Sequence, residues 1–422
     1  MGSSSLRDRA VTRRHAAASA RRANGAASAA GGNTAPAPRR AAAAAPDAGG
    51  SAALENARGL YQRAAQWQRA GRHRDAEAAY VASARALRQV LGGRSPELAE
   101  VIAAHAELAA ELGDHRRARV LGHEGLAVVE RGAGDAARAT RARILGALGN
   151  VHRALGDYRR AGALLRRALA TARGIGAGTR EAALAMNNLG ILYKYSGAFH
   201  RARAHYRQAL RITRRACGPD HPNVAALYHN LGGLAFTMGD YRAAERWGRA
   251  GMELRIRLSG ADHVAVAADA AALGASLDGL GRHGEAQRLY ARALAIFRRR
   301  YGARHYEIAV NLNNLGASLY AQGKLAAAAE NYRAALQMKQ TLLGGDHIDV
   351  ALTANNLGML YMKQRRHALA VRHVERAGEI LTRQLGARHP KTRAVVANLR
   401  ALREARPSIR PTRGAIARDR ST

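Results

Sequence analysis

The chain has 422 residues, of which 47 % are hydrophobic, and a formal net charge of +37, from 68 lysines and arginines against 31 acidic residues. The single cysteine, Cys217, excludes an intramolecular disulfide, and no apolar run approaches the roughly 20 residues that a membrane-spanning helix needs. We therefore expect a cytoplasmic protein with a hydrophobic core and no membrane span. The charge has two explanations: binding to nucleic acid or another anionic surface, or an arginine-rich composition without a binding role.

Residues 1–53 are dominated by Ala, Gly, Ser, Arg and Pro and contain almost no large apolar side chains. Such a segment cannot bury enough surface to offset the entropy that it would lose on ordering. We expect a disordered basic arm. It would act either as a nonspecific tether to phosphates or as a dispensable tail.

From Leu54 onward the sequence repeats with a period of 42 residues, most clearly at Leu189-Gly190, Leu315-Gly316 and Leu357-Gly358. A fixed period of this size is typical of a helical repeat array, and we expect eight helix pairs over residues 54–389. A second glycine marks the turn inside each repeat: Gly71, Gly113, Gly156, Gly197, Gly239, Gly281 and Gly323. In the eighth copy Arg365 stands there instead, so this turn must form without the residue that accepts positive φ most easily.

A third ladder of equivalent residues precedes the first helices of the later repeats: His221, His263, His305, His347 and His389. Packed helices place equivalent residues of neighbouring repeats about 10 Å apart, whereas metal–nitrogen bonds are about 2 Å long, so two of these histidines could not share an ion. We therefore predict that they cap the loops, and we expect no metal site. Residues 390–406 are predicted to form one more helix that caps the array, followed by a disordered tail over 407–422.

These motifs resemble the tetratricopeptide repeat. Leu189-Gly190, Tyr193, Gly197 and Ala202 with Tyr206 match its pattern, and the 42-residue period is similar to that of the kinesin light chain variety. The resemblance covers residues 54–404. It implies an all-α fold, a right-handed superhelical solenoid of about eight antiparallel helix pairs plus a C-terminal capping helix. In this family the first helix of each repeat lines a concave groove that holds a peptide, and asparagines there hydrogen-bond the peptide backbone.

The register of the repeat indicates which residues would face that groove. Met186, Leu189, Gly190 and Tyr193 share one helix face, which we assign to the core, and the opposite side carries Asn187, Ile191 and Lys194. The candidate peptide-binding residues are Asn150, Asn187, Ile191, Lys194, His229, Asn313, Tyr320, Asn355, Met359 and Lys363.

An asparagine amide both donates and accepts a hydrogen bond, which suits a peptide backbone. The alternative for Asn187, Asn313 and Asn355 is a packing role between neighbouring helices. The second asparagine of each motif, Asn188 or Asn314, points about 100° further round the helix, and we expect it to stabilise repeat stacking.

The sequence contains no phosphate-binding loop, no zinc-protease motif, no Cys-x-x-Cys and no nucleophile elbow, so we expect neither an enzyme nor a cofactor. The predicted function is a noncatalytic scaffold that binds a peptide segment of a partner protein. The alternative is a basic nucleic-acid-associated protein that uses the N-terminal arm and arginines of the second helices, such as Arg207 and Arg211. Self-association through an end of the array is a third alternative.

Overall fold

The computed structural model describes residues 48–130, 132 and 134–405, and in this part the chain forms 17 helices. The first helix begins at Ala48 rather than at Leu54. The predictions made for residues 1–47 and 406–422 lie outside the described residues. None of the described helices is both long enough and apolar enough to cross a membrane.

The helices group into two compact units that meet within one helix, between Ile296 and Phe297. The first unit contains α2 (Ala48–Arg69), α3 (His73–Leu91), α4 (Pro96–Glu111), α5 (His115–Val129), α6 (Asp135–Ala154), α7 (Tyr158–Arg173), α8 (Arg180–Tyr195), α9 (Phe199–Cys217), α10 (Pro222–Met238), α11 (Tyr241–Ser259), α12 (Val264–Gly279) and α13 (His283–Tyr301) as far as Ile296. The second unit contains the end of α13, then α14 (Tyr306–Ala321), α15 (Leu325–Leu343), α16 (Ile348–Lys363), α17 (His367–Leu385) and α18 (Pro390–Glu404).

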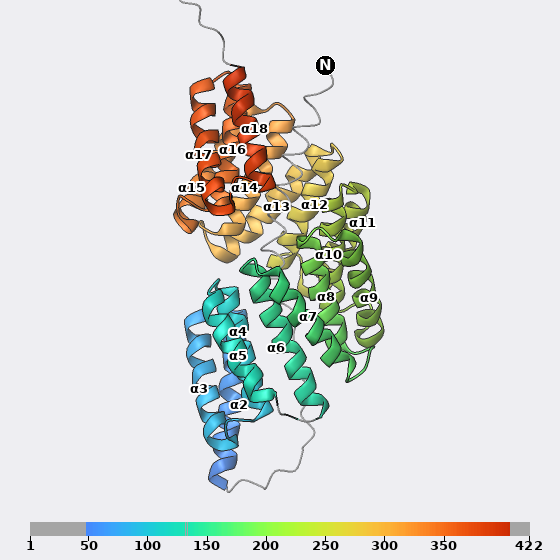
Figure 1. The fold of residues 1–422 in the computed structure, drawn as a ribbon. Helices are drawn as coiled ribbons and strands as arrows, with labels where there is room; N and C mark the ends of the chain where they lie inside the picture. The colour runs from blue at the N-terminus through green and yellow to red at the C-terminus, as the bar shows by residue number, and fades with distance from the viewer. Residues whose placement is uncertain (1–47, 131, 133, 406–422) are drawn as a thin grey trace, which may run out of the picture. The chain divides into compact units, whose positions relative to one another are not determined.

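Consecutive helices pack as antiparallel pairs, as Figure 1 shows for α2 with α3 and for α16 with α17. The even-numbered helix is the first of each repeat and the odd-numbered helix the second. Within each unit the first helices of successive repeats also contact each other, for example α6 with α8 and α14 with α16. The prediction of an all-α array with eight antiparallel pairs and a final helix is confirmed.

The glycine of the Leu-Gly motif sets the distance between the two helices of a repeat. A Cβ atom on Gly190 would lie 2.6 Å from the ring of Tyr206, and one on Gly274 would lie 2.8 Å from the ring of Tyr290. Both rings are buried, at 0 % and 1 % exposure. The tyrosine therefore packs directly on the backbone of the first helix, and any larger residue at the glycine would push the two helices apart.

The turn inside each repeat requires a left-handed residue. Gly197 has φ 81° and Gly323 has φ 77°, and in the eighth repeat Arg365 adopts φ 60°. Arg365 is the one non-glycine residue with positive φ in the part of the chain that the structure describes. The turn of the eighth repeat thus has the same backbone geometry as the other turns. With Arg365 in place of glycine, this geometry is strained.

The five histidines of the ladder, which were predicted to cap the loops, are the N-caps of the helices that follow them. The backbone N–H of Asn223 donates to Nδ1 of His221 at 3.1 Å, and that of Lys391 donates to Nδ1 of His389 at the same distance. His263, His305 and His347 accept equivalent bonds at 3.1–3.3 Å. Each ring therefore satisfies one of the backbone donors that the start of a helix leaves unpaired.

Candidate functional site

The candidate peptide-binding residues all lie on first helices and form a separate row in each unit. In the first unit the row consists of Asn150 on α6, Asn187, Ile191 and Lys194 on α8, and His229 on α10. In the second unit it consists of Asn313 and Tyr320 on α14 and of Asn355, Met359 and Lys363 on α16.

Asparagine side chains connect the first helices of neighbouring repeats. Oδ1 of Asn187 accepts a hydrogen bond of 2.8 Å from Nδ2 of Asn230, one repeat further on. The same bond recurs from Asn356 to Asn313 at 3.1 Å and from Asn398 to Asn355 at 3.0 Å. In each bond the donor is the second asparagine position of one repeat and the acceptor is the first position of the repeat before it. We call these three bonds the amide ladder, and both positions contribute to stacking through it.

The amide ladder uses only the carbonyl side of each acceptor. The Nδ2 groups of Asn187, Asn313 and Asn355 donate to no other described residue. Because Oδ1 is held by the next repeat, the orientation of the remaining NH₂ group is set as well. Asn187 is half-buried, whereas Asn313 and Asn355 are only 4 % and 2 % exposed. The ladder therefore presents fixed hydrogen-bond donors, of which that of Asn187 is the most accessible.

Three other members of the row are buried. Ile191 is 4 % exposed and belongs to the hydrophobic core of the first unit. Lys194 is 7 % exposed, and its Nζ lies 2.9 Å from the place where a Cβ on Gly233 would be, so the absence of a side chain at Gly233 makes room for the ammonium group. Ile191 thus contributes packing, and Lys194 brings a positive charge close to the backbone of the next first helix.

The third buried member, His229, belongs to a charged group that the sequence did not reveal. Nδ1 of His229 lies 2.6 Å from Oδ1 of Asp269, whose Oδ2 accepts a 2.6 Å hydrogen bond from Nε of Arg255. The three residues are 6 %, 2 % and 4 % exposed. Asp269 therefore holds both the imidazole and the guanidinium in the interior. The repeat register contains a signal for this group. Arg255 and Asp269 are oppositely charged, whereas the same positions three repeats later carry the apolar residues Leu381 and Val395.

The remaining members are accessible. Asn150, Tyr320 and Met359 are half-buried, and Lys363 is exposed with its Nζ 4.7 Å from the centroid of the Tyr320 ring. Such a cation–π contact holds the ammonium over the aromatic face. The accessible surface of the row is thus made of amides, one aromatic ring, one thioether and one cation. Across the described residues, no three His, Cys, Asp or Glu side chains come together in a way that could hold a metal ion.

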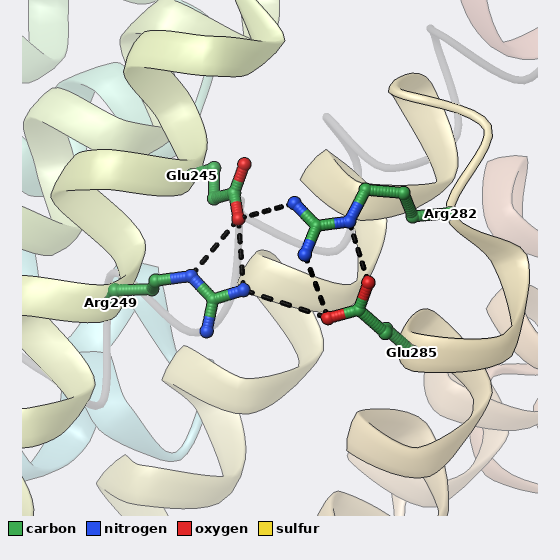
Figure 2. Close-up of polar contacts among 4 residues, drawn as sticks. All are labelled: Glu245, Arg249, Arg282 and Glu285. Atoms are coloured by element: carbon green, nitrogen blue, oxygen red, sulfur yellow. Dashed lines mark hydrogen bonds and ion pairs between the residues drawn. The ribbon is translucent and has the colours of Figure 1, made fainter.

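The second helices carry charged side chains that pair across repeats. Figure 2 shows Glu245 and Arg249 of α11 meeting Arg282 and Glu285 near the start of α13. Glu245 accepts hydrogen bonds from Arg249 at 2.9 Å and from Arg282 at 2.7 Å. Burial raises the pKa of Glu245, but these two guanidinium groups outweigh it and the pKa is lowered; the bonds from Arg282 likewise lower the pKa of Glu285. This network joins two neighbouring repeats on their second-helix side.

Comparison with known proteins adds family and fold information. A sequence model described as the tetratricopeptide repeat matches residues 140–215, 181–257, 266–341 and 307–383. Among curated proteins, none matches this chain in sequence.

Three solved structures show a likeness of fold. The apo form of RapI has 15 % identity and a TM-score of 0.51, over 68 % of this chain and 98 % of that one. BtubC (BKLC) from P. vanneervenii has 24 % identity and a TM-score of 0.46, over 56 % of this chain and 94 % of that one. A putative kinesin light chain from Podosopora anserina has 18 % identity and a TM-score of 0.42, over 49 % and 98 % respectively.

Proposed function

Because the chain belongs to the tetratricopeptide repeat family, we propose that it is a noncatalytic scaffold whose first helices bind a peptide segment of a partner protein. The observation that carries this proposal is the amide ladder. Its Nδ2 groups are fixed donors at repeating positions, and a donor held in place loses little entropy when it binds. A peptide offers the matching acceptors, because every residue has a backbone carbonyl.

The spacing of the ladder suits an extended peptide. Neighbouring first helices lie about 10 Å apart, and a peptide in the extended polyproline II conformation advances about 3.1 Å per residue with three residues per turn. Every third carbonyl of such a peptide lies on the same side and would therefore meet one ladder donor. Specificity would come from the residues beside the ladder, Asn150 in the first unit and Tyr320, Met359 and Lys363 in the second. These favour a partner segment with apolar and carbonyl-rich groups and few basic residues.

The proposal can be tested with a change that leaves the ladder intact. In the variant Asn187→Asp, one carboxylate oxygen still accepts the bond from Asn230, but the other replaces the NH₂ donor with an acceptor. A peptide carbonyl would then face a carboxylate, and we expect the affinity for the partner to fall about tenfold or more. Asn331→Asp is the matched control, because Asn331 is a half-buried asparagine on the second helix α15 whose Nδ2 bonds only within its own helix.

The measurement is affinity capture from nuclease-treated lysate of the source organism, with the full chain as bait. We expect one or more proteins to bind the wild type and Asn331→Asp and to be lost with Asn187→Asp, while all three baits melt at similar temperatures. Equal capture by both variants would show that the ladder donor of Asn187 does not contact the partner, and the proposed binding site would then be wrong.

A further inference from the structure

The second helices of two consecutive repeats in the first unit carry only positive charge. Helix α9 has six arginines and no carboxylate in its 19 residues, and α7 before it has five arginines and no carboxylate in its 16 residues. This is a local feature of the surface, because acidic side chains occur on the second helices on either side, such as Glu124 on α5 and Glu245 on α11.

On other second helices, several arginines are paired with carboxylates. Arg88 of α3 pairs with Glu124 of α5 at 2.6 Å, and Arg257 of α11 pairs with Asp220 at 2.9 Å. Farther along the chain the network in Figure 2 contains two arginines and two glutamates. In the second unit Arg376 binds Asp346 at 2.6 Å. The composition of the chain is basic throughout, and these pairs neutralise part of the charge on the other second helices.

Four arginines of α9 are not compensated. Arg207, Arg211, Arg214 and Arg215 are all exposed, and none of their side chains forms a hydrogen bond or an ion pair with any residue that the structure describes. With Leu210 they line a shallow hollow of about 410 Å³. Leu210 is only 8 % exposed, so the accessible lining is made of the arginine side chains, with their aliphatic stems inside the hollow and their guanidinium groups around it. We call these four residues the α9 arginine cluster.

We propose that the α9 arginine cluster binds the phosphate backbone of nucleic acid. A guanidinium group presents paired N–H donors that match phosphate oxygens, and it stays charged at all relevant pH values. Arg215 lies eight residues after Arg207, which is about 12 Å along the helix axis at 1.5 Å per residue. One strand of duplex DNA carries a charge about every 3.4 Å along its axis, so four phosphates cover a similar length.

The cluster fits nucleic acid better than an acidic protein segment. A peptide would need partners for its backbone amides and a surface for its apolar side chains. The hollow offers no amide groups, and its apolar lining consists of the arginines' own aliphatic stems rather than of a pocket for an apolar side chain. Phosphate contacts need charge alone, and contacts of this kind are independent of base sequence. The proposed binding is therefore independent of base sequence. It uses a second helix, whereas the amide ladder lies on first helices, so either binding proposal can be wrong without affecting the other.

The test measures binding of the full chain to a labelled DNA duplex of about 20 base pairs by fluorescence anisotropy, between about 50 and 200 mM salt. The test variant replaces the whole α9 arginine cluster with glutamine. A control variant removes the same amount of charge from arginines that already have a carboxylate partner: Arg88→Gln, Arg117→Gln, Arg257→Gln and Arg376→Gln.

The slope of log affinity against log salt decreases by about 0.9 for each phosphate that the protein no longer neutralises, so we expect a reduction of about 3 to 4 in the test variant and of less than about 1 in the control. Replacing the cluster with lysine should retain most of the slope, because the point charges remain. Absence of measurable binding by the wild type, or equal losses in the test and control variants, would overturn the proposal. So would a polyglutamate peptide that binds the cluster more tightly than the duplex does, since that result would assign the surface to an acidic protein.

Discussion

At the scale of single residues, the interior of the first unit contains an ion pair where the repeat normally places apolar side chains. Arg255 and Asp269 are 4 % and 2 % exposed and bind each other at 2.6 Å, whereas Leu381 on α17 and Val395 on α18 occupy the same register three repeats later. Removing two charges from water is costly, and only their mutual attraction compensates for it. The pair therefore contributes to stability only while both members are present.

This predicts a strongly non-additive pair of substitutions. Arg255→Leu alone should lower the free energy of unfolding by about 3–5 kcal/mol, because it leaves the buried carboxylate of Asp269 without its guanidinium partner. Adding Asp269→Val should recover part of this loss, because it removes the unpaired carboxylate, although it also removes the partner of His229 Nδ1. Urea unfolding of the two variants and the wild type gives the comparison. A double variant no more stable than Arg255→Leu would show that the carboxylate is not the source of the cost.

Lys339 occupies the register of Arg255 two repeats later, but its partner is the hydroxyl of Thr353, at 2.8 Å. Burial lowers the pKa of Lys339 to about 8, although the carboxylates of Asp349 and Glu307 oppose the shift. The folded state therefore favours the neutral amine, while the unfolded chain keeps the proton up to about pH 10.4. Stability should be reduced below pH 8 and should rise as the pH increases from 8 towards 10.

We expect this rise to be about 2 kcal/mol between pH 8 and 10, at about 1.4 kcal/mol for each pH unit between the folded and unfolded pKa values. Lys339→Met should abolish it, because the variant has no amine to titrate at this site. Urea unfolding at the two pH values measures both proteins. Burial raises the pKa of Tyr206 and Tyr290, which reverses the trend above pH 10 and limits the useful range. The same rise in both proteins would contradict the assignment to Lys339.

At the scale of helices and turns, the eighth repeat offers a natural substitution of the turn glycine. Arg365 has φ 60°, where a residue with a Cβ costs about 1–2 kcal/mol relative to glycine. Arg365→Gly removes this strain but adds flexibility to the unfolded chain, so we expect a net gain in stability of up to about 1 kcal/mol. Gly323→Ala, at the same turn position one repeat earlier, should lower the stability, because alanine would have to adopt the positive φ of Gly323. Thermal unfolding of the two variants tests the pair, and a loss of stability in Arg365→Gly would contradict the account.

The histidine caps predict a dependence of helix stability on pH. Burial, together with the nearby Arg180, lowers the pKa of His221, and only the neutral ring can accept the N–H of Asn223. The contribution of this cap should therefore be complete above about pH 6.5 and be lost as the pH falls through the lowered folded-state pKa.

A cap removed by His221→Ala should cost about 1 kcal/mol at pH 7.5 and clearly less at pH 5. His221→Asn should keep a cap at both pH values, because an asparagine oxygen accepts the same bond without titrating. Unfolding in urea at the two pH values distinguishes these cases. An equal cost of His221→Ala at both values would mean that the ring caps the helix in either protonation state.

The sequence predicted the structure correctly where one residue type has one local role. The turn glycines, the strain expected at Arg365 and the histidine caps all follow from the conformational and hydrogen-bonding limits of a single residue in a known register. The candidate site was predicted less completely. The bond from Asn230 to Asn187 joins residues 43 positions apart, and neither the bond nor the remaining donor can be seen until the helices are stacked. The buried pairing of Arg255 with Asp269 was missed for the same reason.

At the scale of the molecule, each compact unit has its own part of the amide ladder: one bond in the first unit and two in the second. The 42-residue period continues through Ile296 and Phe297 without a change, so no sequence signal marks the boundary between the units. The period therefore predicts the number and order of helix pairs, because it records what every repeat shares. It does not predict where the array divides, because both sides of the boundary share the same repeat.

If a partner peptide lies on the first helices, site-specific photocrosslinking should attach it there. A benzophenone amino acid would replace Tyr320, which is half-buried on the first helix α14, and separately Tyr158, which is 45 % exposed at the start of the second helix α7. With the captured partner present and nuclease added, we predict crosslinks from position 320 and none from position 158. Crosslinks from position 158 alone would place the partner on the second helices and contradict the account.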